Sequence, residues 1–465
     1  MKKTFFTSLF AFLFCWMSAQ TIMTGDALQD SALAVAIRTI DRNTEGRLLK
    51  AGADYGGEWT RDISMNSWNA VSLLRPDIAE FSLWSVTNDH ASIGHQYWDK
   101  IIWTIAAWNH FRITGDEAFL KEAYVCCQRT MRELEDSCFD RKYGLFMGPA
   151  VFQDGIAAYE EPIYDVRWDT IYSGVVNYPN SRTIKCLSTN AVYYESYVCL
   201  AEMAGILQPK MAKVYLKKAE TLKRNFRKHL YNSEEAKLYY LIDHTGKKHE
   251  FQEALGIAYA IMFGLVSESE ARDILSKVYV SPFGIPAVWP HFQRYNDEMP
   301  GRHNVMVWPH VNMYFASACA QVGDYEKCYF EMDNLTRLAT QHDPDGEVNF
   351  HEIYTTQGVP SGGWQGSWQW PPLNHQTWCA TGYLRNYLYV VAGMDFQVDG
   401  LHFHPFGIPS GEVVLKDIHY RNATLNIVVR GCGTQLASCT INGKRSVPFV
   451  PSDAEGLYEI VLEVK

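Results

Sequence analysis

The 465-residue sequence has little positive charge for its size. It carries 42 Lys and Arg residues against 52 Asp and Glu residues, which gives a formal net charge of -10 at pH 7. Proteins that bind nucleic acids show a basic excess or a basic stripe. We therefore expect no nucleic-acid partner. A disordered chain is also excluded, because 47% of the residues are hydrophobic and 14% are aromatic.

The sequence also lacks the short motifs of several catalytic classes. It contains no H-E-x-x-H zinc motif, no Gly-rich phosphate loop and no serine nucleophile elbow. We therefore expect no metal and no cofactor. No two of the 11 cysteines form a C-x-x-C pair. A disulfide between Cys432 and Cys439 stays open, since these two residues could face each other across a β-hairpin.

Long apolar runs are scarce, and the clearest one lies at the N-terminus. Residues 5–17 are almost continuously apolar, follow a basic Lys2-Lys3 head, and precede the small residues Ser18-Ala19. This pattern is typical of a secretory signal peptide, and the run is too short to span a bilayer. The prediction is a signal peptide over 1–19, cleavage near Ala19, a periplasmic or secreted protein, and no membrane span.

The apolar residues that follow repeat mostly with helical spacing. Trp98, Ile101, Ile102, Ile105 and Trp108, for example, lie on one face of a helix. Gly115-Asp116 and Gly323-Asp324 separate neighbouring helices by very short turns, as antiparallel hairpins require. The predicted helices are 27–42, 62–75, 76–88, 98–114, 116–135, 187–205, 209–231, 251–264, 268–278, 304–322, 324–341 and 374–394.

Twelve helices in six antiparallel pairs predict a mainly α fold, an (α/α)6 toroid over residues 20–395. A stacked α-solenoid is the alternative, but the sequence shows no fixed repeat period. After residue 396 the apolar residues alternate, and Asn442-Gly443 is a tight-turn signal. We therefore expect a small antiparallel, β-sandwich-like C-terminal domain over 396–465.

Three long loops, 139–186, 279–303 and 342–373, are rich in Gly, Pro and aromatic residues, and long ordered loops on a rigid scaffold usually carry function. A shorter loop ends in Trp59-Thr60-Arg61-Asp62 at a predicted helix start. There Asp62 is either a helix cap or part of a sugar-binding site. An indole ring stacks on sugar, and a charged pair hydrogen-bonds to hydroxyl groups.

Two carboxylates in the long loops are candidate catalytic groups. Asp154, beside Gly155 among apolar and aromatic residues, is a candidate general acid, and its alternative reading is an Asp-Gly turn. Nearby acidic residues leave the identity of the acid open on chemistry alone: Glu160, Glu161, Asp165 and Asp169. Glu352 precedes a Gly/Trp-rich stretch and is a candidate general base that activates a water.

Further residues at helix starts or in these loops are candidate substrate contacts, although each also has an ordinary packing role. Tryptophans in such positions are available to stack on sugar rings, unlike those on amphipathic helical faces. The candidates are Trp59, Arg61, Asp62, Trp98, Asp99, Asn190, Trp308, His310, Tyr354, Trp364 and Trp368.

These ordered motifs resemble the inverting six-hairpin glycoside hydrolases of the family 63 glucosidase, glucoamylase and mannosylglycerate-hydrolase type. The resemblance covers residues 27–395. It implies that Arg61 and Asp62 hold the terminal sugar, that Asp154 is the general acid, and that Glu352 is the general base. The large N-terminal β domain of many relatives is absent, and the long trehalase signatures are not present.

The resemblance implies inverting hydrolysis of an α-linked oligosaccharide or glycoside, with glucose as the first expectation and mannose next. Such a mechanism needs the two carboxyl groups ~6.5–9.5 Å apart to admit water. Three alternatives remain: a non-catalytic carbohydrate-binding protein, a polysaccharide lyase, for which Tyr194 and His310 are the weak candidates, and a disaccharide phosphorylase.

Overall fold

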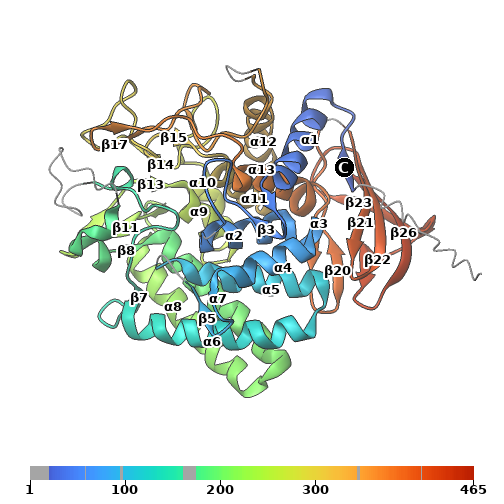
Figure 1. Ribbon diagram of the computed structural model, residues 1–465, viewed down its shortest axis with the longest axis horizontal. Helices are drawn as coiled ribbons and strands as arrows, with labels where there is room; N and C mark the ends of the chain where they lie inside the picture. The colour runs from blue at the N-terminus through green and yellow to red at the C-terminus, as the bar shows by residue number, and fades with distance from the viewer. Residues whose placement is uncertain (1–19, 58, 95–97, 161–173, 343–345, 410) are drawn as a thin grey trace, which may run out of the picture.

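The computed structural model describes residues 20–57, 59–94, 98–160, 174–342, 346–409 and 411–465. The predicted signal peptide, residues 1–19, lies outside the described residues. Within those ranges, every helix is too short or too polar to cross a membrane. Helices make up most of the regular structure, with a β-sheet at one side (Figure 1).

Six helices pack side by side in a closed ring. Around the ring, α2 contacts α5, α5 contacts α7, α7 contacts α9, α9 contacts α11, α11 contacts α13, and α13 returns to α2. Nearly every residue in these helices is buried, as expected for helices covered on both sides. Their bounds are α2 (Thr60–Asn66), continued by η1 (Ser67–Val71) and α3 (Ser72–Leu74), α5 (Trp103–Thr114), α7 (Leu187–Leu207), α9 (Ala254–Met262), α11 (Pro309–Gln321), and α13 (Thr377–Arg385), continued by η6 (Asn386–Val391).

A second set of helices covers this ring and is buried on one face only. The set comprises α1 (Ala27–Arg42), α4 (Pro76–Ser85), α6 (Glu117–Cys138), α8 (Pro209–Leu230), α10 (Glu268–Leu275) and α12 (Tyr325–Ala339). Each predicted helix is therefore present, with ends that differ by a few residues. The largest differences are at α5 and α11, which start at Trp103 and Pro309 rather than at residues 98 and 304.

Local sequence explains where these helices turn. Gly115 ends α5 in a left-handed conformation (φ +74°), and the Asp116 carboxylate then accepts hydrogen bonds from the first amides of α6. Gly323 (φ +76°) and Asp324 repeat the arrangement between α11 and α12. Both short hairpin turns predicted from the sequence are confirmed.

The C-terminal segment forms a six-stranded sheet in the order β1-β21-β22-β26-β23-β24. The expected antiparallel arrangement is wrong for one pair, because β22 and β26 run parallel. The N-terminal strand β1 pairs with β21, so the chain's two ends share a sheet. The strands are β1 (Thr21–Met23), β21 (Glu412–Tyr420), β22 (Asn422–Arg430), β23 (Leu436–Ile441), β24 (Lys444–Arg445) and β26 (Glu455–Val464), with β19 (Met394–Phe396), β20 (Gly400–Phe403) and β25 (Phe449–Pro451) in a separate three-stranded sheet.

Cys432 and Cys439 do not form a disulfide in this sheet. The Cys439 side chain is buried, whereas Cys432 is exposed and its Sγ lies 2.9 Å from the hydroxyl of Tyr325. All ten cysteines from Cys126 to Cys439 are free thiols.

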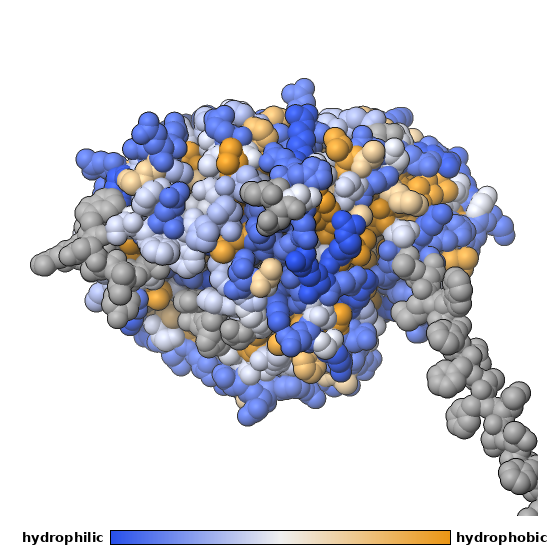
Figure 2. Space-filling model, turned by 45° about the horizontal axis from the view of Figure 1, so that its top comes forward, coloured by the Kyte–Doolittle hydropathy of each residue, from blue (hydrophilic) through white to orange (hydrophobic). Residues whose placement is uncertain are grey.

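Short strands and turns of helix shape the loops between the long helices, and several of them gather at the side of the ring opposite the C-terminal sheet (Figure 1). The surface shown in Figure 2 is predominantly hydrophilic, with apolar residues in small scattered groups. The short strands are β2 (Thr44–Glu45), β3 (Leu48–Leu49), β4 (Thr87–Asn88), β5 (Ser92–Ile93), β6 (Phe139–Asp140), β7 (Leu145–Phe146), β8 (Lys185–Cys186), β9 (Tyr231–Asn232), β10 (Lys237–Leu238), β11 (Leu241–Ile242), β12 (Lys248–His249), β13 (Gln252–Glu253), β14 (Val288–Trp289), β15 (Met306–Val307), β16 (Tyr354–Thr355), β17 (Trp364–Gln365) and β18 (Trp368–Gln369), and the 3-10 turns are η2 (Lys100–Ile102), η3 (Ile156–Ala158), η4 (Val175–Asn177) and η5 (Pro179–Thr183).

Candidate active site

One pocket brings together both candidate catalytic carboxylates, Asp154 and Glu352. Its volume is about 240 Å³, and its walls come from the start of α2 and from the three long loops. The described residues that line it are Ala51, Tyr55, Trp59, Arg61, Asp62, Phe152, Asp154, Gly155, Gly174, Arg302, His303, Trp308, Glu352, Gln365, Trp370 and Trp378.

The first turn of α2 supplies a buried cation to this pocket. The Arg61 guanidinium donates a hydrogen bond from Nη2 to Oδ2 of Asp154 at 2.9 Å, and its Nε lies 3.9 Å from Asp62 Oδ2. It also lies over the indole ring of Trp59. Burial raises the pKa of Asp62 to about 7, although Arg61 lowers it in part and Glu352 and Asp154 raise it. The Asp62 carboxyl therefore retains a proton to higher pH than an exposed aspartate does.

Glu352 has a cation of its own. Arg302 donates from Nη2 to Glu352 Oε2 and from Nη1 to the carbonyl oxygen of Gly362 at 3.0 Å. Nε2 of His303 lies 3.9 Å from Glu352 Oε1. Burial and the neighbouring Arg302 hold the pKa of His303 well below its usual value, so the ring is neutral. The two carboxylates thus each have an arginine partner, which compensates for the cost of burying their charge.

Aromatic rings form one wall of the pocket. The His303 ring stacks on Trp308 with centroids 3.7 Å apart, and Trp378 meets Trp308 edge-on at 5.4 Å. His310 lies behind them, stacked on Trp378 at 4.5 Å. Such flat, largely apolar faces suit stacking against the C–H faces of a sugar ring.

Two lining residues have strained backbones. Phe152 and His303 adopt left-handed φ angles of +65° and +66°, which non-glycine residues rarely do. Strain of this kind costs of order 1–3 kcal/mol per residue and clusters at functional sites. Here it sits two residues before Asp154 and one residue after Arg302, where it fixes the direction of both side chains.

Several contacts hold the loop that follows Asp154. Arg294 donates to the carbonyl oxygens of Ile156 and Tyr159, at 2.6 and 3.0 Å. The hydroxyl of Tyr240 donates to the carbonyl oxygen of Ala158 at 2.9 Å. A small apolar cluster, separate from the main core, packs beneath this loop. The position of Asp154 is thus set by a supported segment.

The predicted site residues divide into those at the pocket and those behind it. Trp59, Arg61, Asp62, Trp308, Asp154 and Glu352 line the pocket. Among the described residues, the remaining predicted residues do not line it. These are Trp98, Asp99, Asn190, His310, Tyr354, Trp364 and Trp368.

Most of these seven have supporting contacts instead. Asp99 Oδ2 accepts a hydrogen bond from the amide of Phe152 at 3.1 Å, and burial raises its pKa. The Asn190 side chain accepts from Phe146 N and donates to the carbonyl oxygens of Phe146 and Cys186, which joins a loop to α7. It is therefore a satisfied core amide rather than a sugar contact.

The other members of this group differ in exposure. Tyr354 is fully buried, and its hydroxyl accepts the amide of His351. Trp98 is also buried and packs against Gly148. His310 is fully buried, and this burial holds its pKa well below the usual value. Trp364 packs on the small apolar cluster, whereas 64% of Trp368 is exposed.

The alternatives for the general acid are also placed. Glu160 is held by His249, away from the pocket lining. Glu161, Asp165 and Asp169 lie outside the described residues.

Sequence reasoning missed several lining residues: Tyr55, Phe152, Arg302, His303, Gln365, Trp370 and Trp378. The long loop 279–303 stands out by its composition, but no pattern in it singles out Arg302. Burial beside Glu352 raises the pKa of Tyr55, so its hydroxyl stays protonated and able to donate.

The sequence matches the model of one known protein family over most of its length. The profile of the mannosylglycerate hydrolase MGH1-like glycoside hydrolase domain matches residues 60–378, which include Arg61, Asp154, Arg302 and Glu352. The chain belongs to this family. No curated protein sequence matches it significantly.

Solved structures similar to this MGH1-like chain share its fold at low identity. The family 63 mannosylglycerate hydrolase from Thermus thermophilus, in complex with glucose, aligns at 12% identity over 76% of this chain and 99% of its own, with a TM-score of 0.57. The family 78 rhamnosidase of Bacillus sp. GL1 aligns at 12% over 96% of this chain, with a TM-score of 0.61, and a sialidase at 13% over 94%, with 0.68. The chain spans only 44% and 41% of those two longer proteins. Its fold is that of a family 63-like (α/α)-barrel glycoside hydrolase.

Proposed function

We propose that this protein is an inverting glycoside hydrolase that removes a terminal α-linked sugar, with glucose as the first candidate. The observation that carries the proposal is the pairing of Asp154 with Arg61 and of Glu352 with Arg302 in one tryptophan-walled pocket. We further propose that the ring and its outer helices form the six hairpins of an (α/α)6 toroid, with 396–465 as a separate β-sandwich-like domain.

In the proposed mechanism, Asp154 protonates the glycosidic oxygen while Glu352 removes a proton from water on the other face of the sugar ring. The ion pair with Arg302 holds the Glu352 carboxylate at the wall of the pocket. Arg61 and Asp62 hydrogen-bond to sugar hydroxyls, and Trp308 or Trp378 stacks on the ring.

The first experiment is a panel of α-glucosides, α-mannosides, α-rhamnosides and mannosylglycerate, with the released anomer followed by NMR. Release of the inverted anomer supports the mechanism. Release of the retained anomer contradicts it, and release from none of these sugars favours a carbohydrate-binding protein.

Variants then separate the two catalytic roles. Asp154→Asn should lose at least 10²-fold in kcat on a natural glycoside but far less on a 2,4-dinitrophenyl glycoside, whose leaving group needs little protonation. Glu352→Gln should lose activity on both. The control is Asp453→Asn, because Asp453 is exposed in a turn and does not line the pocket. Equal losses for Asp154→Asn on both substrates would remove it from the acid role.

We also propose that the protein acts outside the cytoplasm after cleavage near Ala19. The support is the basic and apolar pattern of residues 1–19. N-terminal sequencing of protein expressed with its full leader should begin at about Gln20, and an intact Met1 in the exported fraction would contradict it.

A further inference from the structure

The hairpin formed by β17 and β18 presents one face to the active-site pocket. Gln365 pairs directly with Trp368 across this hairpin, and directly paired residues point to the same side. Trp370, two residues further on, returns to that side, and its amide extends the ladder by donating to Gly363 O at 2.9 Å. Gln365 and Trp370 both line the pocket. Trp368 therefore lies on the pocket side of the hairpin, at its tip.

Trp368 is nevertheless the most exposed tryptophan of the described chain, at 64%. A large aromatic ring left in water forgoes the favourable free energy that burial of apolar surface gives. By contrast Trp364, on the opposite side of the hairpin, packs on the small apolar cluster. Of the two tryptophans in the hairpin, Trp364 thus packs on the protein and Trp368 is exposed to solvent.

The tip is also tied to the candidate acid. The Gln365 side-chain oxygen accepts the amide of Ala157 at 2.8 Å, three residues after Asp154. A methyl group on Gly155 would lie only 1.9 Å from the Gln365 side-chain nitrogen, so the two segments are in close contact. The hairpin that carries Trp368 is thus attached to the segment that follows Asp154.

The pocket itself is small. Its volume of about 240 Å³ lies below the ~300–1,000 Å³ of sites that enclose drug-sized ligands, so it suits about one sugar ring. The remainder of a larger bound glycoside must therefore extend out of the pocket on the side of Asp154, the candidate acid.

We propose that Trp368 is an outer sugar-binding platform, which stacks on the first ring of the leaving group of an oligosaccharide. The inference rests on the proposed function. It specifies that the substrate has at least two rings, and that affinity for the second comes from an aromatic face rather than from charge.

The test compares Trp368→Ala with Trp289→Ala, which removes another exposed tryptophan, stacked on Tyr279 and not in the pocket lining. The probes are maltotriose and methyl α-glucoside. Trp368→Ala should raise KM about tenfold for maltotriose and less than twofold for the methyl glycoside. Equal effects on both, or the same effect in Trp289→Ala, would overturn the proposal.

Binding separates this proposal from the proposed function. Maltotriose is titrated into the Glu352→Gln variant, with and without Trp368→Ala, by calorimetry. A tenfold weaker Kd on loss of Trp368 supports the platform even if the wild type hydrolyses no glycoside. An unchanged Kd, or no binding of maltotriose, mannotriose or a rhamnose-ended disaccharide, overturns the platform whatever the activity.

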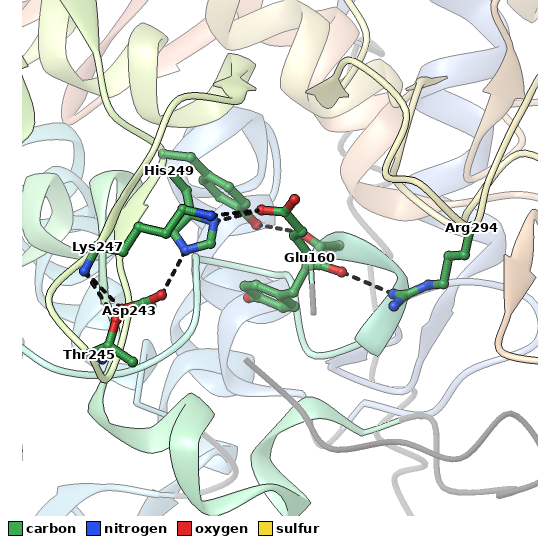
Figure 3. Close-up of polar contacts among 9 residues, drawn as sticks. Glu160, Asp243, Thr245, Lys247, His249 and Arg294 are labelled. Carbon is green, nitrogen blue, oxygen red and sulfur yellow. Dashed lines mark hydrogen bonds and ion pairs between the residues drawn. The ribbon is translucent and has the colours of Figure 1, made fainter. Parts of the chain in front are cut away.

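An independent observation concerns His249, which lies between two carboxylates (Figure 3). Its Nδ1 is 3.0 Å from Glu160 Oε2 and its Nε2 is 3.0 Å from Asp243 Oδ2, while the His249 side chain is only 1% exposed. Both ring nitrogens of His249 therefore lie within hydrogen-bond distance of a carboxylate oxygen. Lys247 Nζ approaches Glu160 at 4.0 Å.

Asp243 is fixed from the other side by its own turn. It accepts hydrogen bonds from the Thr245 amide and hydroxyl and from the Lys247 amide. Burial raises its pKa, but the bonds from His249, Thr245 and Lys247 outweigh this and bring it to about 2. Asp243 is therefore a charged, immobile support for His249.

Glu160 closes the supported segment that begins at Asp154. In Figure 3 the Arg294 guanidinium reaches the same segment from the opposite side. We infer that Asp243, His249 and Glu160 are positioning residues, which hold the loop of the catalytic acid through a clamp of close polar contacts that touches no substrate.

The test uses Glu160→Ala and Glu160→Gln, because Glu160 is partly exposed and its loss leaves the core intact. The alanine variant should lower kcat about tenfold with KM within twofold, and glutamine, which keeps an acceptor, should restore most of kcat. Glu122→Ala, which breaks the surface pair with His90 at 2.8 Å, is the matched control.

Hydrogen exchange at the amides of Ala157, Ala158 and Tyr159 gives a readout independent of activity, since each donates a hydrogen bond in this segment. Glu160→Ala should speed their exchange, and Glu122→Ala should not. Unchanged exchange with unchanged kcat, or a loss of kcat that glutamine does not restore, contradicts the clamp.

Discussion

A buried glutamate, Glu253, makes the folded protein less stable as the pH rises. Glu253 is the last residue of β13, directly before α9, is 1% exposed, and accepts a hydrogen bond from the Ser188 amide at the start of α7 at 3.1 Å. Burial raises its pKa from 4.5 to about 8, although the hydrogen bond from Ser188 lowers it in part. The folded protein thus binds this proton more tightly than the unfolded chain does.

The sign and size of the effect follow from linkage. Since the folded pKa lies above the unfolded one, the stabilisation is fully present below pH 4.5 and is lost as pH rises through 8. The total is on the order of 5 kcal/mol, of which roughly half is lost between pH 5 and pH 7. Glu195 and Glu331, each with a pKa raised by burial to about 7, act in the same direction.

The perturbation is Glu253→Gln, because glutamine resembles the protonated carboxyl and keeps an acceptor for Ser188. Urea unfolding followed by tryptophan fluorescence at pH 5, 6, 7 and 8 gives the free energy of unfolding. Relative to wild type, the free energy of unfolding of the variant should gain about 2–3 kcal/mol between pH 5 and pH 7. The control Glu220→Gln, exposed on α8, should track wild type. Parallel curves for Glu253→Gln and wild type would refute the reasoning.

Three further outcomes test the site and its supports. Arg302→Met should reduce kcat by at least 10²-fold, because it leaves the Glu352 charge buried without its partner, and steady-state kinetics checks this. Gly155→Ala should weaken substrate binding, seen as a higher KM, because its methyl group displaces the Gln365 side chain. Asn190→Ala should cost about 2–4 kcal/mol of stability, measured by urea unfolding, with KM unaltered, since it loses three hydrogen bonds and touches no substrate.

The helices could be read from the sequence because their signals are local. Apolar spacing indicates the buried face. Gly115-Asp116 and Gly323-Asp324 indicate where one helix ends and the next begins. The start of α11 was misjudged because residues 304–308 are as buried as the helix itself, and burial alone does not separate a strand such as β15 from a helical turn.

Long-range pairing was harder to predict. The parallel pairing of β22 with β26, and the entry of β1 into the same sheet, depend on segments far apart in the chain. Alternation in each strand predicts a buried face but not the neighbour or its direction.

Residues of the pocket lining could be predicted where they stand in a short motif and not elsewhere. Arg61 and Asp62 stand in a compact motif at a helix start, whereas Arg302 lies in an irregular loop and meets Glu352 only in three dimensions. Asn190 and Tyr354 were misjudged for the opposite reason. Polar groups close in sequence to a site are as often needed to satisfy buried backbone as to bind ligand.

The ion pair between Arg61 and Asp154 carries a final consequence. Arg61 Nη2 holds Asp154 Oδ2 at 2.9 Å, whereas a general acid must reach the glycosidic oxygen, so under the proposed mechanism Arg61 has to release Asp154 when a sugar hydroxyl arrives. Breaking a buried pair costs free energy that is drawn from substrate binding. Asp154→Asn removes that cost, and Asp99 and Asp62 remain as acidic neighbours of Arg61. The variant should therefore bind the substrate at least as tightly as wild type, by calorimetry, while kcat collapses. A Kd tenfold weaker than that of the Glu352→Gln variant would mean instead that Asp154 binds the sugar directly and that Arg61 keeps its partner throughout the reaction.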